Sequence, residues 1–220
     1  YSQSLAYAGG VLVVPTRAGS IDISYDEGET FTNVAIGDAT SIAGIAANST
    51  GSEFYLLGSS EDTETRTLYL FSTTDNSVTA TSQSGNYAWV GVKPGDDDFI
   101  VIAGTDSALY TTTGVNGTWQ ALTTTAITGE INFVGERIYL GDLYTDDLGI
   151  TTTRLATNAN QLAVDPNNAA VVLVGSSTGI DLSLDGGDTW SNTSAGIKGV
   201  TVNDIAQSDN KKSVWLAAQG

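Results

Sequence analysis

The chain has 220 residues, with 25 acidic and eight basic side chains and a formal net charge of −17. It contains no histidine and no cysteine, which excludes the common zinc, haem and iron–sulfur sites, Ser-His and Cys-His nucleophile systems, and disulfides. Eight cations cannot offset 25 anions against a phosphate backbone, and no apolar run approaches the roughly 20 residues of a membrane span. We therefore expect neither nucleic-acid binding nor membrane insertion.

Candidate β-strands follow one another along the whole chain. Short apolar or alternating runs are separated by clusters of Gly, Asp, Asn and Ser, and no stretch shows the sustained 3.6-residue period of a helix. We count about 22 such candidates. Clear examples, in chain order, are residues 11–16, 53–59, 99–104, 137–141 and 171–175. Many short strands with frequent turns favour a sandwich, a barrel or a propeller.

An internal repeat favours the propeller among these three. Residues 24–31 and 183–190 both read Ser-x-Asp-x-Gly-x-Thr-aromatic. Residues 73–77 keep mainly the Asp, residues 112–119 keep the end of the motif but have Gly114 at the Asp position, and residues 145–149 keep the first half. The motif recurs about every 40 residues, which is the size of a four-stranded propeller blade.

The octapeptide resembles the Asp-box, or bacterial neuraminidase repeat, of sialidases, sortilin-like receptors, some glucanases and photosystem-assembly-factor-like proteins. The resemblance implies that each box forms the hairpin between the third and fourth strands of a blade. The Asp would accept hydrogen bonds from the turn, the second Gly position would take a backbone conformation that side chains resist, and the aromatic would pack under the loop. We predict structural roles for the box residues Ser24, Asp26, Gly28, Phe31, Trp119, Asp147, Gly149, Ser183, Asp185, Gly187 and Trp190.

The predicted fold is all-β: a single-domain β-propeller of four-stranded antiparallel blades, with about five complete blades and a half blade. The complete blades span residues 4–36, 41–82, 87–124, 130–157 and 161–194, and residues 202–220 repeat only the first two strands. Blade one already has its own first hairpin, so it lends no strand to the last blade. Soluble proteins avoid an unpaired apolar edge. We therefore expect a longer polypeptide, or a neighbouring chain that supplies the missing strands.

The sialidase resemblance does not extend to catalytic residues. That family uses three Arg, a Tyr activated by Glu, and an Asp, and it carries a Phe/Tyr-Arg-Ile-Pro motif. This chain has only Arg17, Arg66, Arg137 and Arg154, and none lies in such a motif. A glycosidase could instead use two facing carboxylates, but no particular pair stands out. We predict no catalytic residue and no enzyme activity.

Three adjacent carboxylates are the main metal candidate, the cluster of Asp142, Asp146 and Asp147 is interpreted in the same way, and we expect no other cofactor. Asp96, Asp97 and Asp98 follow the turn at Pro94-Gly95, and Ca²⁺ prefers oxygen ligands. The spaced Asp-x-Asp-x-Asp pattern of a calcium loop is absent, however, and consecutive side chains of an extended chain diverge. A solvated acidic turn is therefore the favoured interpretation, with Ca²⁺ binding as the alternative.

The most favoured function is a non-catalytic structural or recognition module, either secreted or on the surface of a cell or virion, with a protein or glycan partner. Two alternatives stay open: a sialidase- or glucanase-like glycoside hydrolase, and an assembly-factor-like chaperone. The acidity fits a solvated surface that keeps the protein soluble, and also an adaptation to high salt.

Overall fold

The computed structural model describes residues 5–60, 64–123, 127, 129–155, 161–165, 168–176, 179–195, 201–207 and 214–219. The chain divides into two compact units, residues 1–126 (unit one) and residues 127–220 (unit two). No helix in the described part of the chain is long and apolar enough to cross a membrane.

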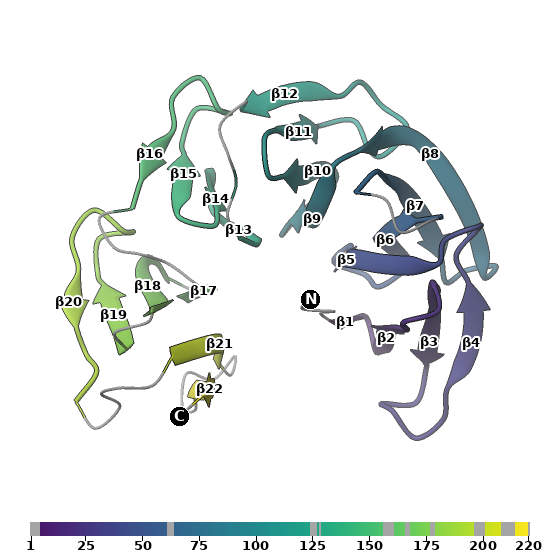
Figure 1. Cartoon of the computed structure of the whole chain (residues 1–220), viewed down its shortest axis with the longest axis horizontal. Helices are drawn as coiled ribbons and strands as arrows, with labels where there is room; N and C mark the ends of the chain where they lie inside the picture. Colours follow the sequence, from purple (N-terminus) through teal and green to yellow (C-terminus); the bar gives the residue numbers. More distant parts are fainter. Residues whose placement is uncertain are drawn as a thin grey trace. The chain divides into compact units, whose positions relative to one another are not determined.

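Unit one contains three sheets, each with four antiparallel strands that are consecutive in the chain (Figure 1). Blade one consists of β1 (Ala6–Ala8), β2 (Val11–Pro15), β3 (Ser20–Ser24) and β4 (Thr32–Ala35). Blade two consists of β5 (Ser41–Ala47), β6 (Glu53–Ser59), β7 (Arg66–Ser72) and β8 (Ser77–Gly85). Blade three consists of β9 (Tyr87–Lys93), β10 (Asp96–Gly104), β11 (Ala108–Thr111) and β12 (Gln120–Thr123).

Unit two repeats this arrangement twice and then adds a two-stranded sheet. Blade four consists of β13 (Ile131–Val134), β14 (Arg137–Leu140), β15 (Leu143–Thr145) and β16 (Thr153–Arg154). Blade five consists of β17 (Gln161–Asp165), β18 (Asn168–Ser176), β19 (Gly179–Ser183) and β20 (Ser191–Asn192). The last sheet pairs β21 (Thr201–Gln207) with β22 (Val214–Gln219). Five four-stranded antiparallel sheets confirm the all-β class and the predicted blade architecture.

The first strands of successive sheets are neighbours within each unit. In unit one, β1 lies beside β5 and β5 beside β9; in unit two, β13 lies beside β17 and β17 beside β21. The turns that join the first two strands of blades one and two also meet, backbone against backbone. A Cβ at Gly9 would lie only 1.8 Å from the Thr50 carbonyl oxygen, and one at Gly51 only 2.1 Å from that of Ala8. Glycine is therefore required at both positions.

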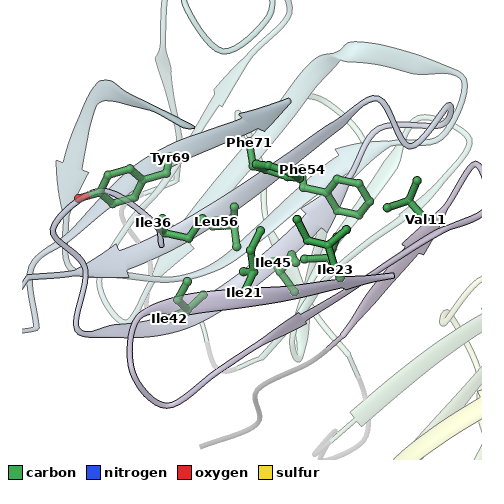
Figure 2. Close-up of a cluster of buried hydrophobic side chains, with 11 residues drawn as sticks. Val11, Ile21, Ile23, Ile36, Ile42, Ile45, Phe54, Leu56, Tyr69 and Phe71 are labelled. Carbon is green, nitrogen blue, oxygen red and sulfur yellow. The ribbon is translucent and has the colours of Figure 1, made fainter. Parts of the chain in front are cut away.

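The hydrophobic core of each unit lies between the faces of neighbouring blades. Between blades one and two, Ile21 and Ile23 of β3 pack with Phe54 of β6 and Phe71 of β7, and all four side chains are fully buried (Figure 2). Burying such a side chain completely contributes about 1.5–3 kcal/mol. Similar clusters lie between blades two and three and between blades four and five. Apolar contacts thus hold the blades of each unit together.

Candidate functional site

The hairpin turn between β19 and β20 is built by a side-chain network around Asp185. The buried Ser183 hydroxyl donates to Asp185 Oδ1 (2.7 Å) and accepts the Gly187 N–H (2.7 Å). The Asp185 carboxylate accepts the Thr189 N–H at 2.8 Å and the Thr189 hydroxyl at 2.5 Å. The same bonds recur in two other blades, with Ser24, Asp26, Gly28 and Thr30 in blade one and with Thr145, Asp147, Gly149 and Thr151 in blade four.

Two successive residues with positive φ close each of these turns. They are Glu27 and Gly28 in blade one, Leu148 and Gly149 in blade four, and Gly186 and Gly187 in blade five. The second position is glycine every time, with φ between 81° and 97°, where a side chain would be strained. The first position tolerates Glu and Leu at φ near 60°. Glycine in the motif therefore has a backbone role in all three turns.

The turn in blade three corrects the sequence alignment by one residue. Thr113 takes the place of the Asp, because its N–H donates to the Thr111 hydroxyl (3.3 Å) and its own hydroxyl accepts the Thr118 N–H (3.3 Å). The prediction that Gly114 occupies this position was wrong. The loop from Thr113 to Thr118 is one residue longer than its counterpart from Asp185 to Thr189, and that insertion displaced the alignment.

The aromatic residues at the end of the motif differ in how deeply they pack. Trp190 Nε1 donates to the Gly187 carbonyl (3.0 Å), and the indole packs against the core between blades four and five. Trp119 Nε1 donates to the Val115 carbonyl (3.1 Å) and packs against the core between blades two and three. Phe31 lacks such a donor, and half of its surface is exposed. The two tryptophans therefore anchor their turns by a hydrogen bond and by packing against the core. Phe31 anchors its turn more weakly.

The carboxylates of these turns are held in their charged form. Hydrogen bonds from the Thr30 side chain and backbone lower the pKa of Asp26 from 3.8 to about 2. Bonds from the Thr189 side chain and backbone lower the pKa of Asp185 to about 2 as well, and the Thr151 backbone N–H lowers that of Asp147. Donors aimed at a carboxylate favour its ionised state. A group held this way stabilises a turn and is poorly suited to act as a general acid near neutral pH.

Arg137 joins blade four to the turn of blade five, a role that no sequence pattern indicated. Its guanidinium forms a two-point ion pair with Asp146 (2.7 and 2.8 Å) and lies 4.0 Å over the Tyr144 ring. It also donates to the Gly186 carbonyl, which accepts the Tyr139 hydroxyl at 2.7 Å. The Asp146 carboxylate raises the Arg137 pKa. An arginine fixed in this way between two blades has a structural role.

A depression of about 450 Å³ lies in unit one, at the ends of β1, β5 and β9 and the turns that follow β5 and β9. Its lining is largely apolar and includes Tyr7, Asn48, Ser49, Val92, Lys93, Pro94 and Asp97. Tyr7 is exposed over 58% of its surface. The Lys93 ammonium lies 5.3 Å from the centre of the Phe99 ring. The sequence pattern assigned no binding-site role to Tyr7, Asn48, Ser49 or Lys93, because they converge from three blades.

The three candidate calcium ligands differ in their surroundings. Asp97 accepts the Ser49 N–H and the Ser49 hydroxyl, both at 2.8 Å, and so ties blade three to the turn of blade two. Asp96 and Asp98 are exposed on either side of it. Among the residues that the structure describes, no group of three or more acidic side chains is placed to hold a metal ion. Calcium binding by Asp96, Asp97 and Asp98 stays an untested prediction.

One tyrosine–glutamate pair superficially matches sialidase chemistry. The Tyr55 hydroxyl donates to Glu53 Oε2 at 2.7 Å. The Tyr55 side chain is almost completely buried, however, and burial followed by the Glu53 carboxylate raises its pKa. A nucleophilic phenol needs access to substrate and a lowered pKa. Tyr55 therefore belongs to the core between blades two and three, with Glu53 as the acceptor for its hydroxyl.

The chain was compared with known families and proteins. No known protein family matches it, and no curated protein does. Several solved structures match. YCF48 from Cyanidioschyzon merolae has a TM-score of 0.69 and 14% identity, over 98% of this chain and 79% of that chain. A crystal structure of an ancestral GH74 enzyme has a TM-score of 0.51 and 16% identity, over 98% of this chain and 27% of that chain. YCF48 bound to D1 peptide has a TM-score of 0.47 and 12% identity, over 96% of this chain and 86% of that chain.

The two likenesses with TM-scores above 0.5 and the sheet topology define the fold. The chain is a β-propeller with four-stranded antiparallel blades. At 14–16% identity the similarity shows the fold alone, and propellers serve many unrelated functions. The function must therefore be argued from the residues of this chain.

Proposed function

We propose that this protein is a non-catalytic recognition module that binds an extended polypeptide segment in the unit-one depression. The observation that carries the proposal is the combination of a fixed rim with an exposed aromatic side chain. Gly9 and Gly51 hold two of the surrounding turns in backbone contact, and the bonds between Ser49 and Asp97 fix the third. Tyr7 projects beside this rim. A preformed site loses little conformational entropy on binding.

The acidic groups of the depression favour recognition over hydrolysis. Glycoside hydrolysis by the common mechanisms needs two carboxyl groups about 5–9.5 Å apart. Asp97 is the one carboxylate among the residues that line the depression, and both of its oxygens accept hydrogen bonds from Ser49. It is therefore engaged in structure and is a poor acid or nucleophile.

The chemistry of the lining favours a peptide over a glycan. A sugar requires many hydrogen-bonding groups, but Asn48 donates to Ser52 and accepts the Glu53 N–H, and Ser49 is bonded to Asp97. Alanines, Val92 and Pro94 form much of the remaining surface. Apolar side chains of a peptide fit such a surface, while Lys93 can attract a peptide carboxylate or carbonyl.

We also infer that the turns of blades one, four and five are Asp-boxes in the structural sense, since all three have the same bonds around the Asp. The predicted location outside the cell, or on the surface of a cell or virion, stays a prediction.

A displayed library of random peptides, selected against the full chain, tests the proposal. Selected peptides should bind with saturation, and Tyr7→Ala and Lys93→Glu should each weaken binding about tenfold, as expected for side chains at the centre of an interface. Leu184→Ala changes an exposed side chain of unit two and is the matched control. A glycan array and a panel of fluorogenic glycosides complete the experiment. Glycan binding without peptide binding, or turnover of any glycoside, would overturn the proposal.

A further inference from the structure

Asn116, in the turn between β11 and β12, is the one asparagine of this chain that is followed by glycine. A peptide-bound asparagine loses its amide when the backbone nitrogen of the next residue attacks the side-chain carbonyl carbon, and glycine leaves that nitrogen unshielded because it has no side chain. The Asn116 side chain is exposed, and it forms no hydrogen bond with any residue that the structure describes. Sequence and exposure together therefore favour reaction at this amide.

Other asparagines on the surface are held by hydrogen bonds. Asn33 Nδ2 donates to Asp22 Oδ1 at 2.7 Å, and Asn192 Nδ2 donates to Asp181 Oδ1 at 3.0 Å. Each of these two asparagines is also followed by a β-branched residue, whose side chain crowds the backbone nitrogen. The structure thus distinguishes Asn116 from asparagines that are equally exposed to water.

The single Asp-Gly step of the chain, at Asp185 and Gly186, provides a protected counterpart. The Gly186 N–H donates to the Ala170 carbonyl of β18 at 2.9 Å. Aspartate cyclises through its protonated carboxyl group, but hydrogen bonds from the Thr189 side chain and backbone lower the pKa of Asp185 to about 2. Its carboxylate therefore stays charged and bonded, and both reacting groups of this step are held apart from the reaction.

The attacking nitrogen next to Asn116 is held only by its own turn. The Gly117 N–H donates to the Gly114 carbonyl at 2.9 Å, and both residues belong to the loop from Thr113 to Thr118. A bond within an exposed loop opens locally, without unfolding of the blade. The turn should therefore slow the attack by only about two- to tenfold relative to an unstructured peptide.

We propose that Asn116 is a site of spontaneous covalent modification, at which cyclisation onto Gly117 converts the side-chain amide to a carboxylate. A bond forms between the Gly117 nitrogen and Asn116 Cγ, the bond from Cγ to Nδ2 breaks, and ammonia leaves with the proton of the Gly117 N–H. Water then opens the cyclic imide. Addition at Cγ restores the main chain and gives aspartate, whereas addition at the main-chain carbonyl gives isoaspartate, in which the chain continues through the side chain. No oxidant or reductant is consumed.

The isoaspartate product should loosen the turn of blade three, because it lengthens the main chain by one methylene group where space is limited. A Cβ at Gly117 would lie only 1.9 Å from Thr113 Oγ1. That hydroxyl accepts the Thr118 N–H at 3.3 Å, and the next residue is Trp119, which packs against the core between blades two and three. Loss of one such hydrogen bond should lower the unfolding temperature by roughly 2–4 °C.

Incubation of the full chain in mildly alkaline buffer, followed by peptide mapping with mass spectrometry, tests the proposal. Position 116 should gain the mass of an amide-to-acid conversion at least about tenfold faster than any other asparagine, and an isoaspartyl methyltransferase should label it. Asn116→Gln is the matched control: it keeps an exposed amide but needs a larger ring, so it should suppress the conversion. A synthetic peptide of residues 111–120, which lacks the folded turn, should convert about two- to tenfold faster than the protein.

Three results would overturn the proposal: an intact Asn116 in the protein after the peptide has converted fully, faster conversion of another asparagine, or an equal gain of mass in the Asn116→Gln variant. The test uses the unaltered protein, so loss of folding cannot explain a negative result. Anion exchange separates the modified chains, and an isoaspartate form as stable as the original would contradict the predicted loosening. None of these readouts depends on peptide binding in the unit-one depression.

Discussion

The hairpin turns of blades one, four and five have Asp at the motif position where the turn of blade three has Thr113. Where an Asp stands, its carboxylate accepts a backbone N–H at 2.8 Å; where Thr113 stands, its hydroxyl accepts the equivalent N–H at 3.3 Å. Hydrogen bonds to an ionised acceptor are shorter and stronger. The buried hydroxyl of Ser or Thr at the end of the third strand is common to all four turns. The comparison indicates that this hydroxyl defines the turn and that the carboxylate tightens it.

Replacing the second glycine should give the largest effect, and two turns of the same type make a matched pair. A Cβ at Gly187 would lie 3.0 Å from Leu155 Cδ2, whereas one at Gly28 would have no neighbour nearer than 3.8 Å. Both residues have φ near +97°, so alanine at either position costs about 1–3 kcal/mol in backbone strain. Gly187→Ala should lower the unfolding temperature more than Gly28→Ala. Equal shifts in calorimetry would show that Leu155 moves aside freely.

Removing the buried hydroxyl should destabilise the turn by about 1–3 kcal/mol. Ser183→Ala leaves the N–H groups of Asp185 and Gly187 without their acceptor, and an unsatisfied buried donor costs about that much. At roughly 2–4 °C per kcal/mol for a chain of this size, the unfolding temperature should fall measurably. Ser183→Thr is the control, since blade four has Thr145 at this place. If the alanine variant is as stable as wild type, the hydroxyl does not define the turn.

A stronger hydrogen-bond acceptor at position 113 in the turn of blade three should stabilise the protein, whereas the two preceding substitutions destabilise it. In Thr113→Asn the amide oxygen can accept the Thr118 N–H without adding charge near Asp98, which lies beside Gly114. We expect a gain of about 0.5–1.5 kcal/mol, the usual net value of one hydrogen bond. Denaturant unfolding measures it. A loss of stability would mean that the extra residue in this loop prevents the tighter geometry.

The smallest effect concerns pH. Because hydrogen bonds in the folded chain lower the pKa values of Asp26 and Asp185 from 3.8 to about 2, their stabilising contribution is complete above pH 4. It should be lost as the pH falls towards 2. Carboxyl chemical shifts measured by NMR should give both midpoints. Thr189→Val should raise the Asp185 midpoint towards 3.8 and leave that of Asp26 unchanged. Midpoints near 3.8 for both residues in wild type would contradict the structure.

Local sequence determined the strands, the turns and the type of sheet. A short apolar run followed by Ser or Thr, Asp and Gly contains its own hydrogen-bonding partners within eight residues. The turn at 183–190 could therefore be predicted, together with its Asp, Gly and Trp. The weaker copy at 145–149 was identified only in part, because Thr151 lies outside the portion that matched. The copy in blade three was misaligned because one inserted residue is invisible to a fixed spacing.

Contacts between blades were decided by the tertiary structure. Arg137 meets Gly186 from a position 49 residues away, and Asp97 meets Ser49 from 48 residues away. Tyr7, Asn48 and Lys93 come together only because the first strands of three blades lie side by side. No local pattern encodes such meetings, since they depend on how whole sheets pack against one another. The repeat within the sequence specified each blade, and the packing of the blades created the depression where we place recognition.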